Sequence, residues 1–153
     1  MASTINASVS PTTGIITTAD STGDLNLQTN GTTALALSAG KLINPSVTNY
    51  TETAYTANSG TAITLALTNG TVQIITLTGN ATITMPTVGA GKSFILMLKQ
   101  DATGSRTVTW TTVKWSGGTA PTITGTASKQ DIFSFFSDGT NWYGGTIGLN
   151  YTP

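Results

Sequence analysis

Five aromatic side chains lie close together near the carboxyl end of the chain, in the stretch DIFSFFSDGTNWYGG from Asp131 to Gly145. The turn dipeptide Asp138-Gly139 separates them into two groups, and Asn141 follows closely. Rings beside Asp and Asn are typical of a sugar-binding cleft, but they are also typical of a tightly packed β-hairpin. The stretch is therefore either a binding site or part of the scaffold.

Paired carboxylates would indicate glycoside hydrolysis, in which the two groups lie about 5–9.5 Å apart. Asp131 begins the expected strand and Asp138 lies in the turn after it. At about 3.3 Å per residue, the strand separates them by roughly 20 Å, so they do not form such a pair within one chain. Asp20 and Asp24 would make a poor calcium cage, and we expect them to cap turns instead.

The chain contains neither Cys nor His. Nucleophilic catalysis by Ser or Cys with His is therefore excluded, and so are zinc clusters and disulfides. Gly89-Ala-Gly-Lys92 lacks the spacing and the following helix of a phosphate-binding loop, so it reads as a Gly-rich connection between strands. We expect no catalytic residue, no metal site, no cofactor and no enzymatic activity.

Charged residues make up 8% of the 153 residues, with six acidic and six basic side chains, against about 25% in an average protein. The basic residues are dispersed, which argues against a nucleic-acid partner because phosphate binding needs clustered Lys and Arg. The longest apolar run, Phe94 to Leu98, is too short for membrane insertion, and MASTINASVS has no secretory signal pattern. Few charges and many hydroxyls also favour association with other chains.

Alternating apolar residues and frequent Gly, Asn, Asp and Pro predict an all-β protein without a convincing helix. We expect residues 46–153 to form an antiparallel, jelly-roll-like β-sandwich as the head domain. The segments Phe94–Leu98 and Ile132–Phe136 are apolar on both faces, which predicts that a second sheet or another subunit covers the outer face.

A β-hairpin is predicted between Ile63–Leu67 and Val72–Leu77. Asn69-Gly70 would supply a type I′ turn, and the two-residue loop would place Leu67 opposite Val72 and Leu65 opposite Ile74. Further strands are expected at Ala81–Met85, which Pro86 would end, and at Arg106–Trp110.

Residues 1–45 are polar, contain no aromatic residue and carry aliphatic residues at a spacing close to ten. This spacing predicts either a repeating β stem wound from three chains or an extended arm that orders only against a partner. In the first case the trimer core would contain Ile5, Ile15, Leu25, Leu27, Leu35 and Leu37. We expect the segment to serve trimerisation and attachment to a larger particle.

The alternation of residues in the aromatic stretch places Phe133 and Phe135 on one face and Ile132 and Phe136 on the other. Trp142 and Tyr143 would lie on the return strand and contact the Phe rings across the pair. This pattern favours a scaffold role for the stretch. Trp115 and Trp142 are the best-placed candidates for contact with a glycan.

The segment from Gly91 to Gly145 resembles a module of bacteriophage tail-fibre and other virion surface proteins. The motifs that carry the resemblance are G-x-x-F-x-L-x-L-K-Q-D, a Thr-Val-x-Trp strand and the terminal DGTNWY hairpin. STGDLNLQTNGTTALALSAGK is similar to the repeats of fibre shafts. The resemblance implies a trimeric β structure built into a virion, with no catalytic residues to carry over.

We therefore expect a non-enzymatic structural protein of the virion, assembled in the host cytoplasm. Its length favours a short fibre or a capsid-decoration protein that attaches through its N-terminal arm, with the β domain outward. The partners would be two sister chains, other capsid or tail proteins, and a host surface glycan. The alternative is a carbohydrate-binding or host-receptor-binding β module.

Overall fold

The computed structural model describes Gln28–Thr29, Thr32–Thr33 and residues 48–153. The chain divides into two compact units, Met1–Thr48 and Asn49–Pro153. In the first unit, strands β1 (Gln28–Thr29) and β2 (Thr32–Thr33) form an antiparallel pair in which Gln28 pairs with Thr33. The predicted stem residues Ile5, Ile15, Leu25, Leu27, Leu35 and Leu37 lie outside the described residues, as do Asp20 and Asp24.

The second unit contains nine strands in two sheets. The strands are β3 (Ala54–Asn58), β4 (Ala62–Thr64), β5 (Val72–Leu77), β6 (Ala81–Thr84), β7 (Ser93–Gln100), β8 (Val108–Trp110), β9 (Val113–Trp115), β10 (Gln130–Ser137) and β11 (Trp142–Tyr151). Two short 3-10 helices, η1 (Leu67–Asn69) and η2 (Ser116–Gly118), lie in connections. Residues 48–153 contain no α-helix.

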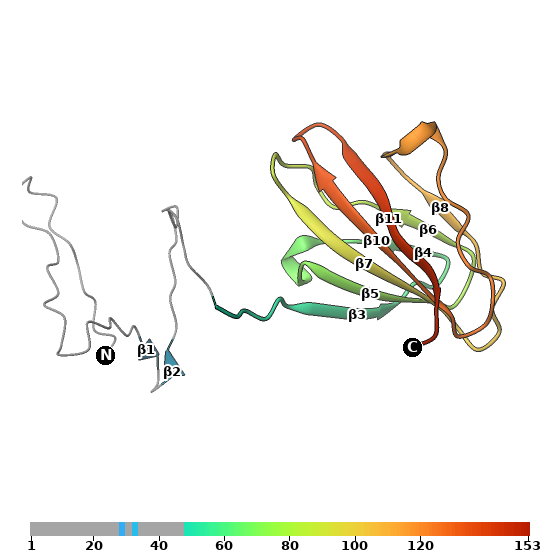
Figure 1. Cartoon of the computed structure of the whole chain (residues 1–153), viewed down its shortest axis with the longest axis horizontal. Coiled ribbons are helices and arrows are strands. Elements are labelled where there is room, and N and C mark those ends of the chain that lie inside the picture. Colours follow the sequence, from blue (N-terminus) through green and yellow to red (C-terminus); the bar gives the residue numbers. More distant parts are fainter. Residues whose placement is uncertain (1–27, 30–31, 34–47) are drawn as a thin grey trace, which may run out of the picture. The chain divides into compact units, whose positions relative to one another are not determined.

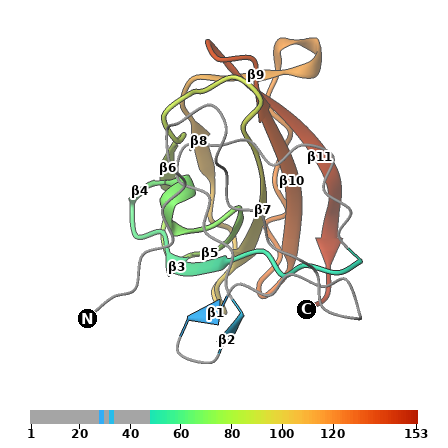
Figure 2. The same cartoon turned by 90° about the vertical axis from the view of Figure 1, so that its left-hand side faces the viewer.

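The first six strands of this unit alternate between the two sheets. The odd-numbered strands β3, β5 and β7 are parallel neighbours in the six-stranded sheet, and β4, β6 and β8 are parallel neighbours in the three-stranded sheet. Figure 2 shows the three-stranded group and the larger sheet on opposite sides of the unit. The chain therefore winds around the core three times, and each turn adds one strand to each sheet.

The last three strands complete the larger sheet, whose order is β3-β5-β7-β10-β11-β9. β10 is antiparallel to both β7 and β11, whereas the short β9 is parallel to β11. The all-β class predicted from the sequence is confirmed. The sheets are mixed, so the antiparallel pairing that the sequence predicted needs correction for β3 to β8, which pair in parallel within each sheet.

The predicted hairpin at Asn69-Gly70 is wrong. Asn69 ends the 3-10 helix η1, and Gly70 has φ 140° in the connection from one sheet to the other. Val72 pairs with Ala54 and Ile95, not with Leu67. The alternation of apolar residues is the same whether a tight turn or a crossover joins two strands, so it did not distinguish the two. In the structure, β5 forms its backbone hydrogen bonds with its parallel neighbours β3 and β7.

A buried glutamine fixes this crossover. Gln73 is fully buried, and its Nε2 donates hydrogen bonds to the carbonyl oxygens of Ala66 and Gly70. A Cβ at Gly70 would overlap the carbonyl oxygen of Thr53, so the loop passes β3 at a distance that only glycine allows. The alternation of apolar residues gives no sign of the close approach between Gly70 and Thr53.

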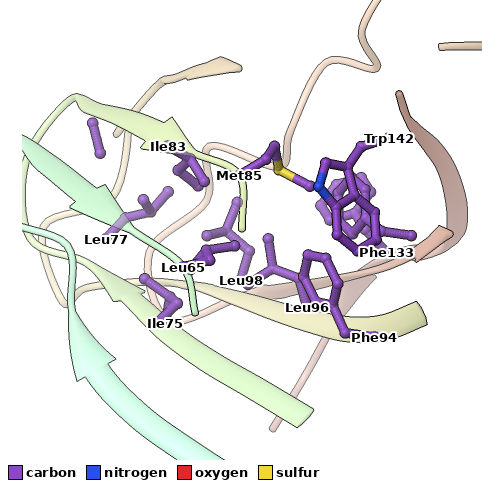
Figure 3. Packing of buried hydrophobic residues seen from close by; sticks show 12 residues of the cluster. Leu65, Ile75, Leu77, Ile83, Met85, Phe94, Leu96, Leu98, Phe133 and Trp142 are labelled. Carbon is purple, nitrogen blue, oxygen red and sulfur yellow. The ribbon is translucent and has the colours of Figure 1, made fainter. Parts of the chain in front are cut away.

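The core lies between the two sheets and contains side chains from both (Figure 3). Leu96 and Leu98 from β7 share this core with Ile83 from β6 and with Met85, the residue after β6. The chain leaves β6 just before Pro86, as predicted. The complete set of buried apolar residues is Leu65, Ile75, Leu77, Ala81, Ile83, Met85, Phe94, Leu96, Leu98, Phe133, Phe135 and Trp142.

The outer face of the six-stranded sheet is also apolar. Ile74, Met97 and Ile132 alternate with core residues on β5, β7 and β10, and each is half-buried. Phe136 and Ile147 are 55% and 53% exposed. Parallel strands are usually covered on both faces, yet within residues 48–153 the three-stranded sheet covers only the inner face.

Candidate functional site

The β10–β11 hairpin carries the aromatic stretch, as the sequence predicted. Phe136 pairs with Tyr143 and Ser137 pairs with Trp142, and the chain reverses between Asp138 and Asn141. The Oδ1 atom of Asp138 accepts hydrogen bonds from the backbone N–H groups of Thr140 and Asn141, both at 2.8 Å. This Asx-type turn therefore fixes which rings face the core and which face outward.

The inward-facing rings form one packed cluster with Phe94. The Phe94 and Phe135 rings stack with centroids 4.9 Å apart, and the edge of Trp142 meets Phe94 at 5.2 Å. The indole Nε1 of Trp142 donates a 2.7 Å hydrogen bond to the carbonyl oxygen of Pro86. Trp142 is only 1% exposed. The predicted glycan contact there needs correction, because the ring packs among the core residues (Figure 3).

Trp115, the other candidate for glycan contact, lies at the end of β9 and is half-buried. Its ring packs edge-on against Trp110, with centroids 5.2 Å apart, and against Phe135, at 5.7 Å. It also lies over Gly144, where a Cβ would be 2.5 Å from the ring. Its Nε1 is buried without a hydrogen-bond partner in the described part of the chain. Contact with a glycan at Trp115 stays a prediction.

Two rings face outward instead, Phe136 at 55% exposure and Tyr143 at 39%. They stack across the strand pair with centroids 5.5 Å apart and an interplanar angle of 25°. The Tyr143 hydroxyl donates a 3.0 Å hydrogen bond to Oδ2 of Asp138. The sequence placed Phe136 on the face opposite to Phe133 and Phe135, but it did not single out the pair with Tyr143. The alternation of Phe136 with Phe133 and Phe135 was the signal that could have found this pair.

Hydrogen bonds set the charge state of this turn. Backbone donors at Asn141 and Thr140, together with the Tyr143 hydroxyl, hold the pKa of Asp138 below its usual value. The same carboxylate raises the pKa of Tyr143 above its ordinary value, because the phenol is its hydrogen-bond donor. At neutral pH the turn therefore presents an ionised carboxylate tied to a neutral phenol.

Two other residues considered in the sequence, Asp131 and Lys92, have structural contacts in the domain. Asp131 is 2% exposed and accepts hydrogen bonds from the backbone N–H groups of Thr124 (2.6 Å) and Asn150 (2.9 Å). It lies at the opposite end of β10 from Asp138, in agreement with the prediction that the two do not form a catalytic pair. Lys92, beside Gly89 and Gly91, directs its Nζ to the carbonyl oxygen of Thr87 at 3.4 Å.

Residues 48–153 and the two short strand segments before them contain no cluster of three or more acidic side chains that could hold a metal ion. In the same part of the chain, no helix is long and apolar enough to cross a membrane.

The domain combines two wound sheets with a terminal aromatic hairpin, and the motifs of this hairpin carry the resemblance to virion surface proteins. The family described as "Putative phage tail fibre C-terminal domain" matches residues 54–142, more than half of the chain. The chain belongs to this family and is a structural protein of a phage fibre, a component of the virion. No curated protein and no solved structure matched the chain.

Proposed function

We propose that the chain is a non-enzymatic subunit of a short virion fibre, attached to the particle through residues 1–45 with the β domain outward. The observation that carries this proposal is the division of the chain. Residues Asn49–Pro153 form a compact unit with its own two-sheet core, and all the aromatic residues lie within it. This unit is also the part that the family match covers.

The polar segment before this unit has a different composition. Its few isolated aliphatic residues do not bury enough surface to offset about 1–2 kcal/mol of backbone entropy per residue. It therefore needs contacts with sister chains or with the particle, which suits an attachment segment. Subunits that associate as a homotrimer would supply such contacts, and they would also cover apolar surface on the outer face of the large sheet.

Deletion of residues 1–45 tests the attachment. We expect the remaining chain to be soluble and to melt cooperatively, because its core is complete, but to be missing from purified virions. Incorporation would be measured by immunoblotting of particles from a phage that carries the truncated gene, with the full-length gene as the control. Normal incorporation of the truncated protein would place the attachment site in the β domain and overturn the proposal.

The position on the particle distinguishes a tail fibre from a capsid-decoration protein. Immunogold labelling of intact virions with an antibody to residues 48–153 would show the position directly. Label on the tail is expected from the family match, whereas label over the whole capsid surface would favour decoration.

A further inference from the structure

The six-stranded sheet has two edges, and among residues 48–153 both are open. At one edge, β3 pairs only with β5. At the other edge, the short strand β9 pairs with Trp142–Gly144 alone, so the rest of β11, Gly145–Tyr151, has a partner strand on one side only. Open strand edges present unpaired backbone N–H and C=O groups, which are templates for pairing with another chain.

The bonds between β3 and β5 identify the backbone groups that β3 leaves free. Thr53 and Ser59, the residues on either side of β3, both form backbone hydrogen bonds with β5. Successive residues of a strand direct their backbone groups to alternate sides, so the odd-numbered residues face β5. Ala54, Thr56 and Asn58 therefore direct their N–H and C=O groups to the open side, and their side chains are exposed as well.

Neither edge carries the side chains that protect an open strand. Charged residues and Pro prevent edge-to-edge association in many proteins, but Ala54–Asn58 and Gly145–Tyr151 contain neither. The second stretch has register shifts against β10, and such bulges can also protect an edge. Its apolar side chains are nevertheless exposed, with Ile147 at 53% and Leu149 at 42%. Both edges thus suit contact with another uncharged strand.

The two edges run in the same direction. β3, β5 and β7 are parallel, and β10 is antiparallel to both β7 and β11, so β11 is parallel to β3. A rotation about an axis along the strands keeps the strand direction, and it brings β3 of one copy beside β11 of the next copy as a parallel pair. Contacts between two unlike edges form a closed ring when the rotation closes.

The two edges also occupy the same rows of the sheet. When the paired residues are followed from strand to strand, Ala54 shares a row with Gly145, and Asn58 shares a row with Tyr151. β9 lies beside the rows before these, so it leaves open a stretch of β11 that has the height of β3. A rotation about an axis along the strands causes no shift along them, so β3 of one copy meets this open stretch in the next.

We propose that β3 of each subunit pairs with Gly145–Tyr151 of the next subunit in the homotrimer. The threefold axis would lie on the side of the outer face, so that the three large sheets join at their edges and their apolar outer faces turn toward one another. The inference rests on the proposed trimer and names the strands that form its contact. It does not depend on attachment to the particle through residues 1–45.

Cysteine cross-linking of the full chain tests the pairing, because the chain has no Cys of its own. Thr56 shares a row with Gly148, the neighbour of Ile147, and both Thr56 and Ile147 are exposed. Adjacent strands lie about 4.7–4.9 Å apart, which is within reach of a disulfide. After mild oxidation, Thr56→Cys combined with Ile147→Cys should give mainly a covalent species of three times the 15.7 kDa mass on non-reducing electrophoresis.

Two controls use the same chemistry. Each single-cysteine variant should form no cross-link, because β3 meets β11 and not a second β3. Thr56→Cys combined with Thr109→Cys should also stay uncross-linked, since Thr109 is exposed on β8 in the other sheet. A cross-linked dimer of Thr56→Cys alone would indicate a twofold contact and overturn the proposal. Species larger than three subunits would also overturn it, because the ring would not close.

Thr56→Pro provides a second readout without an engineered bond. Pro is tolerated on an edge strand where its nitrogen faces away from the neighbouring strand, so the bonds to β5 stay intact while one outward N–H is lost. The variant should raise the dissociation constant of the trimer by about tenfold or more, since each trimer loses three such donors. Thr64→Pro removes an outward N–H from the open edge of β4 in the three-stranded sheet and should leave the trimer unchanged.

Light scattering of the unsubstituted chain separates failure of this contact from failure of the trimer. A trimer that neither cross-links through Thr56 and Ile147 nor weakens with Thr56→Pro would keep the proposed assembly and overturn the edge pairing. A stable monomer would overturn both.

Discussion

At the scale of single residues, aromatic rings are the largest fully buried side chains of the domain. Trp142 is the largest fully buried side chain, and it joins the hairpin to the segment after β6 through its bond to Pro86. We expect Trp142→Ala to lower the free energy of unfolding by about 3–5 kcal/mol, because it leaves a cavity. Trp142→Phe should cost about 1–3 kcal/mol, because the Pro86 carbonyl loses its donor.

Urea denaturation followed by circular dichroism measures both variants. Tyr143→Ala serves as the control, since the Tyr143 ring is 39% exposed and the loss of its stacking contact with Phe136 should cost only about 0.5–1.5 kcal/mol. If Trp142→Ala were no more destabilising than Tyr143→Ala, the core position of the indole would be contradicted.

At the scale of elements, the crossover between the sheets depends on a glycine. Gly70→Ala would place a methyl group against the backbone of Thr53, the residue before β3, in addition to the strain of a positive φ. We expect a loss of more than about 2 kcal/mol in the free energy of unfolding. Thermal denaturation of the full chain measures the effect as a lowered Tm.

Gly117→Ala is the control that separates the strain of a positive φ from the steric overlap with Thr53. Gly117 also has a positive φ, at 70°, but nothing lies within 4 Å of the position that a Cβ would take. This control should cost only about 1–2 kcal/mol, the penalty for a left-handed conformation. Equal losses in the two variants would mean that β3 can move away from the crossover.

Two similar patterns in the sequence gave different outcomes at this scale. The stretch around Asp138-Gly139 predicted a hairpin correctly, because β10 and β11 follow one another in the same sheet. The stretch around Asn69-Gly70 has the same alternation and a better turn dipeptide, yet β4 and β5 belong to different sheets. The alternation of apolar residues indicates which face of a strand is buried. It does not indicate which other strand pairs with it.

The candidate site shows the same limit. The sequence identified the aromatic stretch and the facing of Phe133, Phe135 and Phe136, because period-two alternation is local information. It favoured Trp142 for ligand contact, although burial of that ring depends on Phe94 and Pro86, which are distant in the chain.

At the scale of the whole molecule, the apolar outer face predicts self-association. We expect the full chain to be a homotrimer at micromolar concentration, with three times the 15.7 kDa mass of the monomer. Size-exclusion chromatography with light scattering measures the mass. A stable monomer would contradict the prediction.

A pair of charge substitutions tests the contribution of exposed apolar residues. Ile147→Lys places a charge at a 53% exposed apolar position on β11 and should shift the equilibrium toward monomer. Thr109→Lys places the same charge at an exposed position on β8, in the three-stranded sheet, and should leave the trimer unchanged. If the second variant dissociated and the first did not, the contact would lie on the other sheet.

The winding of β3 to β8 bears on how such a domain changes length during evolution. Each turn of the chain adds one strand to each sheet and stacks on the turn before it, with Ala54 beside Val72 and Val72 beside Ile95. Duplication of one whole turn would extend both sheets and their shared core without altering the β10–β11 hairpin. Loss of a single strand would shorten one sheet without shortening the other and would leave part of the shared core uncovered. Homologous domains should therefore differ by complete turns, and shorter insertions should fall in the connections between the sheets.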